Sequence, residues 1–276
     1  ALPLAFLWGV IVMQARQGEF TEAQPIRLGV RAATFGDVKA SFKDGLRDIR
    51  RRPGLSLFFG LVYALFGLAL LAGFTVFDQI WIVIAAGIGF PLVAPFLAAG
   101  LYEMSRRYKR GDRFTASDIF LVIFRQQRRE FGWMSFVVLF VFWIWAYQFR
   151  LILALTVQSH GYRSFDHLLT TIFSTGEGAA FLAVGTLVGG VIATVLYCIT
   201  VMAMPLLLDK NVDCVTAMIT SVQAVLKSPG VMLVWGAIIG ALTLLSVVPG
   251  FIGVIIVFPI LGHTSWHLYE RLVCEK

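Results

Sequence analysis

Two histidines near the end of the chain are the side chains best placed to do chemistry together. His263 and His267 lie four residues apart in an apolar stretch that we expect to be helical, so they share a helix face. Together they could bind a haem or a metal ion, but a metal normally needs three or four protein ligands. The other histidines, His160 and His167, fall in a different loop. Structural hydrogen bonding is the favoured interpretation, and cofactor binding (haem) or a polar lipid-headgroup site are the alternatives.

Glu103 and Arg150 are the other ionisable residues near the apolar segments. Glu103 precedes a basic cluster and is expected to form an ordinary ion pair with it. Arg150 lies roughly eighteen residues, or about 27 Å, from the inner end of its segment. We therefore expect it at the outer membrane interface, either as an anchor or paired with Asp166 or Glu177.

Sequence motifs of common enzymes are missing. The chain has no Walker A, H-E-x-x-H or G-x-S-x-G pattern. No charged residue falls near the middle of an apolar segment, where proton pumps and ion-coupled transporters usually keep one. We assign no catalytic residue and no metal site. A membrane enzyme that acts on lipids through His263, His267 and Glu103 is the third-ranked interpretation, after the two functions given at the end of this section.

The composition indicates a membrane protein. Apolar residues make up 58% of the 276 residues, charged residues 14%, and the mean hydropathy is +0.82. A soluble domain of this size has too little interior for so much apolar surface. The net charge of +7 does not indicate a nucleic-acid partner, because the charges flank apolar segments instead of forming one basic face. The three cysteines form no C-x-x-C pair.

Six apolar segments are long enough to cross a bilayer core of roughly 30 Å. They lie near residues 55–76, 80–104, 132–157, 178–208, 230–247 and 250–270. A tight hairpin at Val248-Pro249-Gly250 separates the last two. Twenty-one of the 23 Lys and Arg residues fall before the first segment, in alternate loops or after the last one. The positive-inside rule then predicts a multi-pass protein of the bacterial inner membrane with both termini cytoplasmic.

Residues 1–35 are expected to form an N-terminal segment outside the six-helix domain of residues 36–273. Residues 1–13 are apolar but short for a span and lack the basic start of a signal peptide. An interfacial or loosely ordered segment is the favoured interpretation. A seventh span, or a true start at Met13, are the alternatives.

Several loops are predicted to be amphipathic helices at the membrane surface. They lie in residues 36–52, 165–173 and 213–228, and a weaker pattern of the same kind lies in residues 119–124. They would brace the bundle or offer a docking surface to a partner. The basic residues expected to contact anionic headgroups or a partner subunit are Arg50, Arg51, Arg52, Arg106, Arg107, Lys109 and Arg110.

The chain also contains a parallel internal repeat. An amphipathic segment ends at Pro53-Gly54 before the first apolar segment, and another ends at Pro229-Gly230 before the fifth. The second helix of each hairpin ends on Leu-Tyr-Glu, at residues 101–103 and 268–270. We therefore predict that hairpins one and three pack pseudo-symmetrically around hairpin two. The inverted repeats of many transporters are not visible.

Four stretches resemble a family of uncharacterised bacterial inner-membrane proteins, domain of unknown function 2189. They are residues 35–70, 89–107, 205–209 and 261–269, and the strings Gly-Leu-Tyr-Glu-x-Ser-Arg-Arg and Gly-His-x-x-Trp-His-Leu-Tyr are the most specific. The resemblance covers roughly residues 25–273. Some members are labelled as a cytochrome c oxidase subunit, but the family has no established catalytic residues to carry over.

These observations predict an all-α integral membrane protein of six helices in three hairpins. The favoured function is that of a non-catalytic accessory, assembly or scaffold subunit bound to other membrane-protein subunits, for example in a respiratory complex. The alternative is a transporter or permease-like protein for a small apolar or amphipathic solute.

Overall fold

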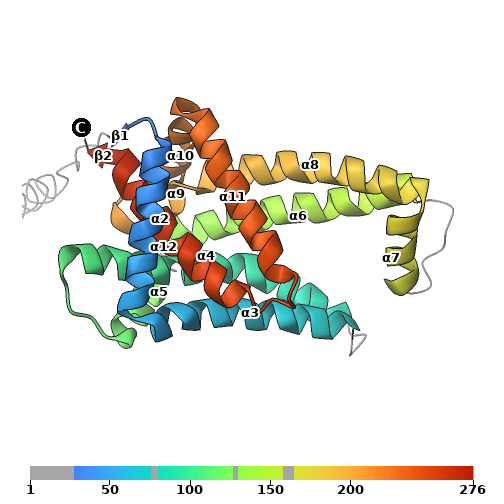
Figure 1. Ribbon diagram of the computed structural model, residues 1–276, viewed down its shortest axis with the longest axis horizontal. Helices are drawn as coiled ribbons and strands as arrows, with labels where there is room; N and C mark the ends of the chain where they lie inside the picture. Colours follow the sequence, from blue (N-terminus) through green and yellow to red (C-terminus); the bar gives the residue numbers. More distant parts are fainter. Residues whose placement is uncertain (1–27, 76–79, 127–129, 158–164, 276) are drawn as a thin grey trace, which may run out of the picture.

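The computed structural model describes residues 28–75, 80–126, 130–157 and 165–275. This part of the chain is almost entirely helical (Figure 1). Its elements are β1 (Leu28–Val30), α2 (Phe35–Arg51), α3 (Pro53–Thr75), α4 (Ile80–Arg110), α5 (Ala116–Gln126), α6 (Glu130–Thr156), α7 (Phe165–Ser174), α8 (Gly176–Thr200), α9 (Ala203–Asp209), α10 (Cys214–Lys227), α11 (Pro229–Val247), α12 (Val254–Leu272) and β2 (Val273–Glu275). The prediction for residues 1–13 concerns residues outside this described part.

Four helices within the described residues are long and apolar enough to cross a membrane. They span Pro53–Gly73, Glu130–Thr156, Gly176–Asp209 and Pro229–Val247, and correspond to the first, third, fourth and fifth predicted segments. The second segment falls in α4, where most side chains of the first half lie outside the described residues. The sixth falls in α12, which is apolar from Val254 to Leu261 and polar beyond. An all-α, multi-pass membrane protein is therefore confirmed at this level.

Local signals explain where the helices begin. Pro53 starts α3 and Pro229 starts α11, where proline fits because the first helical N–H needs no partner. Thr34 caps α2 in a reciprocal capping box with Asp37, and Asp213 caps α10 through a hydrogen bond from the N–H of Thr216. The predicted hairpin at Val248–Gly250 is confirmed, since α11 ends at Val247 and α12 begins at Val254.

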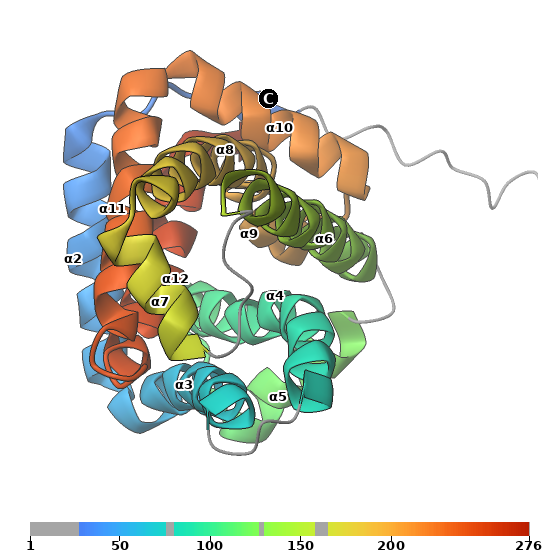
Figure 2. The same ribbon diagram turned by 90° about the vertical axis from the view of Figure 1, so that its right-hand side faces the viewer.

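The long helices pack on chain neighbours and on distant helices alike. The α3 helix packs on α4, α6 packs on α8 and on α4, and α12 packs more extensively on α3 than on α11. Figure 2 looks along α3, α4, α6 and α8, with α6 and α8 above α3 and α4, and with α11 seen from the side at the left. Few residues separate α3 from α4 and α11 from α12 in the chain, whereas α7 lies between α6 and α8.

The amphipathic helix α2 lies across α12, and the contact between them is the most extensive between any two described elements (Figure 1). Its fully buried residues are Ser41, Gly45 and Asp48, while the predicted apolar stripe is only half-buried. Gly45 allows the close approach, because an added Cβ would lie 2.8 Å from Oγ1 and 2.9 Å from the backbone N of Thr264. The second half of α12 is therefore covered by a polar helix instead of lipid.

The two ends of the described chain meet in a short antiparallel sheet. Strand β1 pairs with β2 in the register Leu28 opposite Glu275 and Val30 opposite Val273. Lys227, at the end of α10, donates to the carbonyl of Val30 at 2.7 Å. These bonds hold the strand pair against α10 and α12, on the side where α2 also packs. No strand was expected from the sequence.

Candidate functional site

His263 is completely buried between α3 and α4, and hydroxyl groups contact both of its ring nitrogens. Ser56 Oγ lies 3.0 Å from Nε2, and Ser105 Oγ lies 2.7 Å from Nδ1. A serine hydroxyl can donate or accept, so the pair satisfies either neutral tautomer of the imidazole. The ring thus joins α12 to α3 and α4 through two hydrogen bonds, and both of its nitrogens have a partner. This is the structural role favoured from the sequence.

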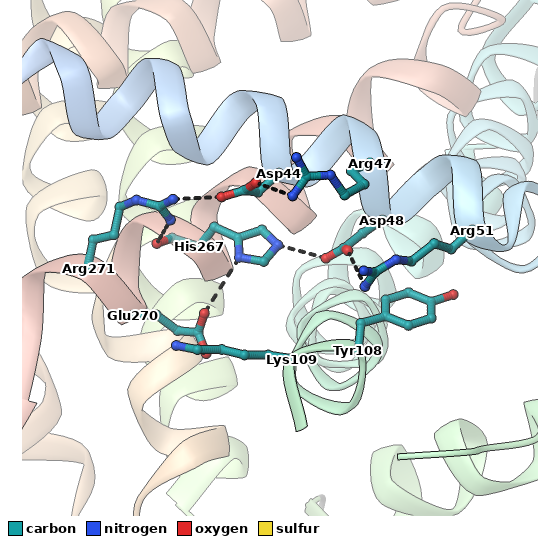
Figure 3. Close-up of a pocket in the computed structure, with 9 residues that line it drawn as sticks. All are labelled: Asp44, Arg47, Asp48, Arg51, Tyr108, Lys109, His267, Glu270 and Arg271. Atoms are coloured by element: carbon teal, nitrogen blue, oxygen red, sulfur yellow. Dashed lines mark hydrogen bonds and ion pairs between the residues drawn. The ribbon is translucent and has the colours of Figure 1, made fainter. Parts of the chain in front are cut away.

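His267, one helical turn later, faces different partners. Its Nε2 lies 2.7 Å from Oδ2 of Asp48 on α2, and its Nδ1 lies 3.5 Å from Oε2 of Glu270 (Figure 3). Burial acts to lower the pKa of His267, but the hydrogen bonds to Asp48 and Glu270 outweigh it and raise this pKa to about 8. His267 lies beyond the apolar half of α12, outside the candidate spans. The two histidines therefore do not form a common site.

A pocket of about 450 Å³ surrounds His267 between α2, α4 and α12. Three carboxylates line it, and each bridges two cationic groups (Figure 3). Asp44 contacts Arg47 at 3.0 Å and Arg271 at 2.6 Å; Asp48 contacts Arg51 at 3.3 Å and His267; Glu270 contacts Lys109 at 3.1 Å and His267. The guanidinium of Arg51 also lies over the Tyr108 ring, 5.0 Å from its centroid.

A second ion-pair network lies on the same side of the molecule. Glu103, 3% exposed, contacts Arg106 Nη1 at 3.1 Å and Arg107 Nε at 2.6 Å, so the predicted ion pair is confirmed. Tyr269 donates to Asp209 at 3.0 Å. This network joins α4 to α9 and α12, and its carboxylates are neutralised by neighbouring cations, which suits a structural role.

The basic residues expected at the surface divide into three groups. Arg51 and Lys109 line the pocket, while Arg106 and Arg107 pair with Glu103. Arg52 lies over the Phe114 ring, 4.7 Å from its centroid, and Arg50 and Arg110 are exposed. Their contact with headgroups or a partner stays a prediction.

Five charged residues of the pocket were missed by sequence reasoning: Asp44, Arg47, Asp48, Glu270 and Arg271. His267 and Asp48 are 219 positions apart, so nothing in the sequence placed them together. One signal was available. Asp44 and Asp48 share a face of α2 at the i, i+4 spacing, and His267, Glu270 and Arg271 share a face of α12.

A second feature of the surface is a row of exposed aromatic side chains on α6. Their spacing alternates between three and four residues, and their exposed fractions run from 53% to 75%: Trp133, Phe136, Phe140, Trp143 and Tyr147. Arg150 continues the same spacing toward the end of the helix and is exposed. Only 6% of this candidate span is buried, compared with 17–39% of the other three. We call these six residues the α6 stripe.

Other sequence-predicted residues lie outside what the structure describes. These are His160, together with the side chains of His167 and Asp166. The pairing of Arg150 with Asp166 or Glu177 thus stays a prediction. Among the described residues, no group of three or more His, Cys, Asp or Glu side chains is arranged to hold a metal ion.

Comparison with known proteins yields one match. Residues 82–209, which run from α4 to α9, match the model of a family described as "Predicted integral membrane protein (DUF2189)". That range is narrower than the residues 25–273 expected to resemble the family, and its description contains no oxidase assignment. No curated protein and no solved structure matched the chain. Residues 82–209 are thus similar to a predicted integral membrane protein family, domain of unknown function 2189, the family that the motif at residues 89–107 also resembles.

Proposed function

We propose that this protein is a non-catalytic accessory, assembly or scaffold subunit that binds a transmembrane helix of another membrane protein along the α6 stripe. The observation that carries this proposal is the spacing of five exposed aromatic side chains on α6. An alternation of three and four residues is the 3.5-residue period with which one helix packs along another.

Lipid contact alone accounts poorly for the α6 stripe. Trp and Tyr concentrate at the two membrane interfaces, where their polar groups reach water. Trp143 instead lies at the middle of α6, about 20 Å from Glu130 at 1.5 Å per residue, so interfacial anchoring does not explain it. Large rigid rings in a continuous row are typical of residues that dominate protein interfaces.

Arg150 indicates the chemistry of the partner. This residue extends the α6 stripe toward the outer end of the helix. A partner helix that follows the aromatic residues would place one of its own side chains beside the guanidinium. A carboxylate at that level would pair with Arg150 where the membrane environment strengthens electrostatic attraction.

We further propose the membrane arrangement that this role requires. Six crossings in the bacterial inner membrane, with both termini cytoplasmic, follow from the loop distribution of the 21 basic residues. The helices α4 and α12 would return beside α3, on which both pack, with the polar end of α12 at the level of the cytoplasmic headgroups. Supporting the parallel repeat, α3 and α11 both begin at a proline directly after an amphipathic helix, α2 or α10. A respiratory complex is one example of the larger membrane assembly to which such a subunit would bind.

Replacement of two stripe residues tests the proposal. Phe136→Ala with Phe140→Ala removes neighbouring rings that are 56% and 57% exposed. A matched control is Leu244→Ala with Leu245→Ala on α11, whose side chains are 73% and 68% exposed. Mild-detergent purification and mass spectrometry should find a stoichiometric membrane partner with the wild-type chain and the control. The stripe variant should recover at least about tenfold less of it.

Two results would contradict the accessory role. One is a wild-type chain that purifies without any stoichiometric partner. The other is equal recovery of the partner by the stripe variant and the control. Both variants should elute as well-folded protein, since neither removes a buried side chain.

A second candidate, transport of a small apolar or amphipathic solute, has one supporting observation. An apolar pocket of about 330 Å³ lies between α4, α6 and α8, and is lined by small residues such as Ala94, Gly189 and Ala193. The substitution Gly189→Leu would fill it. Loss of solute accumulation in cells with this variant, with partner recovery unchanged, would favour transport over the accessory role.

A further inference from the structure

We propose that the pocket around His267 binds a phosphate-bearing anion, supplied either by a phospholipid headgroup or by a soluble phosphate compound. The proposal concerns a different part of the molecule from the α6 stripe and does not depend on the accessory role.

The charges that line the pocket leave a positive excess. Three carboxylates face four permanently cationic side chains, which gives a net charge of +1 before His267 is counted and +2 when it is protonated: Asp44, Asp48 and Glu270 against Arg47, Arg51, Lys109 and Arg271. An anion that enters the pocket removes this imbalance. Although the pocket contains charges of both signs, its net positive charge produces an electrostatic potential that favours anions.

The cations retain free hydrogen-bond donors. The side chains of Arg47, Arg51 and Lys109 are 57%, 46% and 61% exposed, whereas their carboxylate partners Asp44, Asp48 and Glu270 are 25%, 4% and 15% exposed. Arg47 and Arg51 each contact a carboxylate through Nη1, which leaves the rest of the guanidinium fork available. A guanidinium fork matches two phosphate oxygens at once, and these charge-assisted hydrogen bonds are stronger than neutral ones.

The carboxylates hold the cations in place. Asp44 contacts both Arg47 and Arg271, so it fixes one cation from α2 and one from α12. Asp48 and Glu270 do the same for Arg51, Lys109 and the imidazole. Preorganised donors lose less conformational entropy when an anion arrives. Two of these ion pairs lie within α2, and the pairs made by Arg271, Lys109 and His267 join α2, α4 and α12 around the pocket (Figure 3).

Size and position both fit a headgroup. A volume of about 450 Å³ lies in the usual range of small-molecule sites. The pocket lies beyond the apolar half of α12 and beside the basic helix α2, on the side of the chain that is rich in Lys and Arg. Basic pockets between helices at this level of a membrane protein recognise anionic lipid headgroups.

Binding of defined probes to the purified full-length chain tests the proposal. Native mass spectrometry would compare phosphatidylglycerol with phosphatidylcholine, and calorimetry would follow inorganic phosphate. The double variant Arg47→Gln with Lys109→Gln removes two pocket cations. The control Arg50→Gln with Arg113→Gln removes two exposed cations that do not line the pocket. We expect binding by the pocket variant to be at least about tenfold weaker than by the control.

A single substitution keeps the comparison usable if the double variant does not fold. Arg47→Glu reverses one exposed pocket charge, and Arg50→Glu reverses a charge three positions along the same helix. Binding should fall in the first of these and persist in the second. Charge retention by Lys109→Arg should preserve most of the binding.

The outcomes separate the two sources of phosphate. Selective loss of phosphatidylglycerol binding, with no heat from inorganic phosphate in any chain, assigns the pocket to a lipid headgroup. Pocket-dependent heat from inorganic phosphate assigns it to a soluble phosphate. Two results would overturn the proposal. One is an equal loss of binding in the pocket and control variants. The other is a wild-type chain that binds phosphatidylglycerol no better than phosphatidylcholine and gives no heat with inorganic phosphate.

Discussion

His263 connects three helices through one side chain. Its imidazole meets Ser56 on α3 and Ser105 on α4, and all three side chains are fully buried. Replacement by alanine would leave two hydroxyls without partners and open a cavity. Each of these effects is among the larger single-residue costs in folded proteins.

We therefore expect His263→Ala to lower the free energy of unfolding by roughly 2–4 kcal/mol. Thermal unfolding of the detergent-solubilised protein would measure the change. Val195→Ala, at a position 53% exposed on α8, is the control and should unfold like the wild-type chain. An unchanged transition in His263→Ala, with the loss of a haem absorption band instead, would favour the cofactor alternative.

His267 makes a pH-dependent contribution to stability. Its pKa is raised from 6.5 to about 8 in the folded chain, because hydrogen bonds to Asp48 and Glu270 outweigh the effect of burial. A group with a raised pKa stabilises the fold fully below its unfolded pKa, and that stabilisation is lost as the pH rises through the folded pKa. Other charges that face the ring are Asp44, Arg47 and Arg51 on α2, Lys109 on α4 and Arg271 on α12.

The wild-type chain should accordingly lose about 2 kcal/mol of stability between pH ~6.5 and a pH above ~8. His267→Gln should remove most of this dependence, since glutamine does not titrate. Unfolding transitions recorded across that pH range would measure it. A variant with the same pH profile as the wild-type chain would contradict the assigned role of His267.

At the scale of elements, the crossing of α2 over α12 assembles the pocket. Gly45 and Thr264 meet at this crossing, and Asp48 lies one turn further along α2. A methyl group at position 45 would press on the backbone of α12 as well as on a side chain, so the helices would have to separate. The distance between Asp48 and His267 would then increase.

We expect Gly45→Ala to destabilise the protein by about 1–3 kcal/mol, although alanine favours helix more than glycine does. Gly185→Ala on α8 is the matched control, because an added Cβ there meets nothing within 4 Å. That control should be neutral or stabilised by up to about 1 kcal/mol. Thermal unfolding would compare them, and equal behaviour of the two variants would show that the α2–α12 contact is looser than described.

Sequence reasoning located most of these elements but not their contacts. Apolar length located α3, α6, α11 and the span formed by α8 with α9 to within a few residues, because a span must bury nearly every side chain in lipid or protein. The same reasoning extended the sixth segment to residue 270, although α12 turns polar after Leu261. Polar residues at the end of a span are explained equally well by the membrane–water interface or by another helix that covers them. The sequence could not distinguish these explanations, because the covering helix α2 lies more than two hundred positions from α12.

For the whole molecule, the charge asymmetry makes a topological prediction. A periplasm-active reporter fused after Lys276 should be silent, and one placed in the 158–164 connection should be active, because almost all Lys and Arg fall on the other side. Enzymatic activity of the two fusions in intact cells would measure it. Activity after Lys276 would overturn the cytoplasmic placement of the C-terminal end.

Composition and charge pattern by themselves determined that this chain is a helical, multi-pass membrane protein, because lipid solvation and the positive-inside bias act on each segment independently of its neighbours. Tertiary structure alone decided the pairing of Asp48 with His267, the burial of His263 between two serines and the β1–β2 closure. Each of these depends on helix crossings between residues far apart in the chain. A local sequence pattern does not specify which distant helix packs against it, so the pocket could be identified only from the tertiary structure.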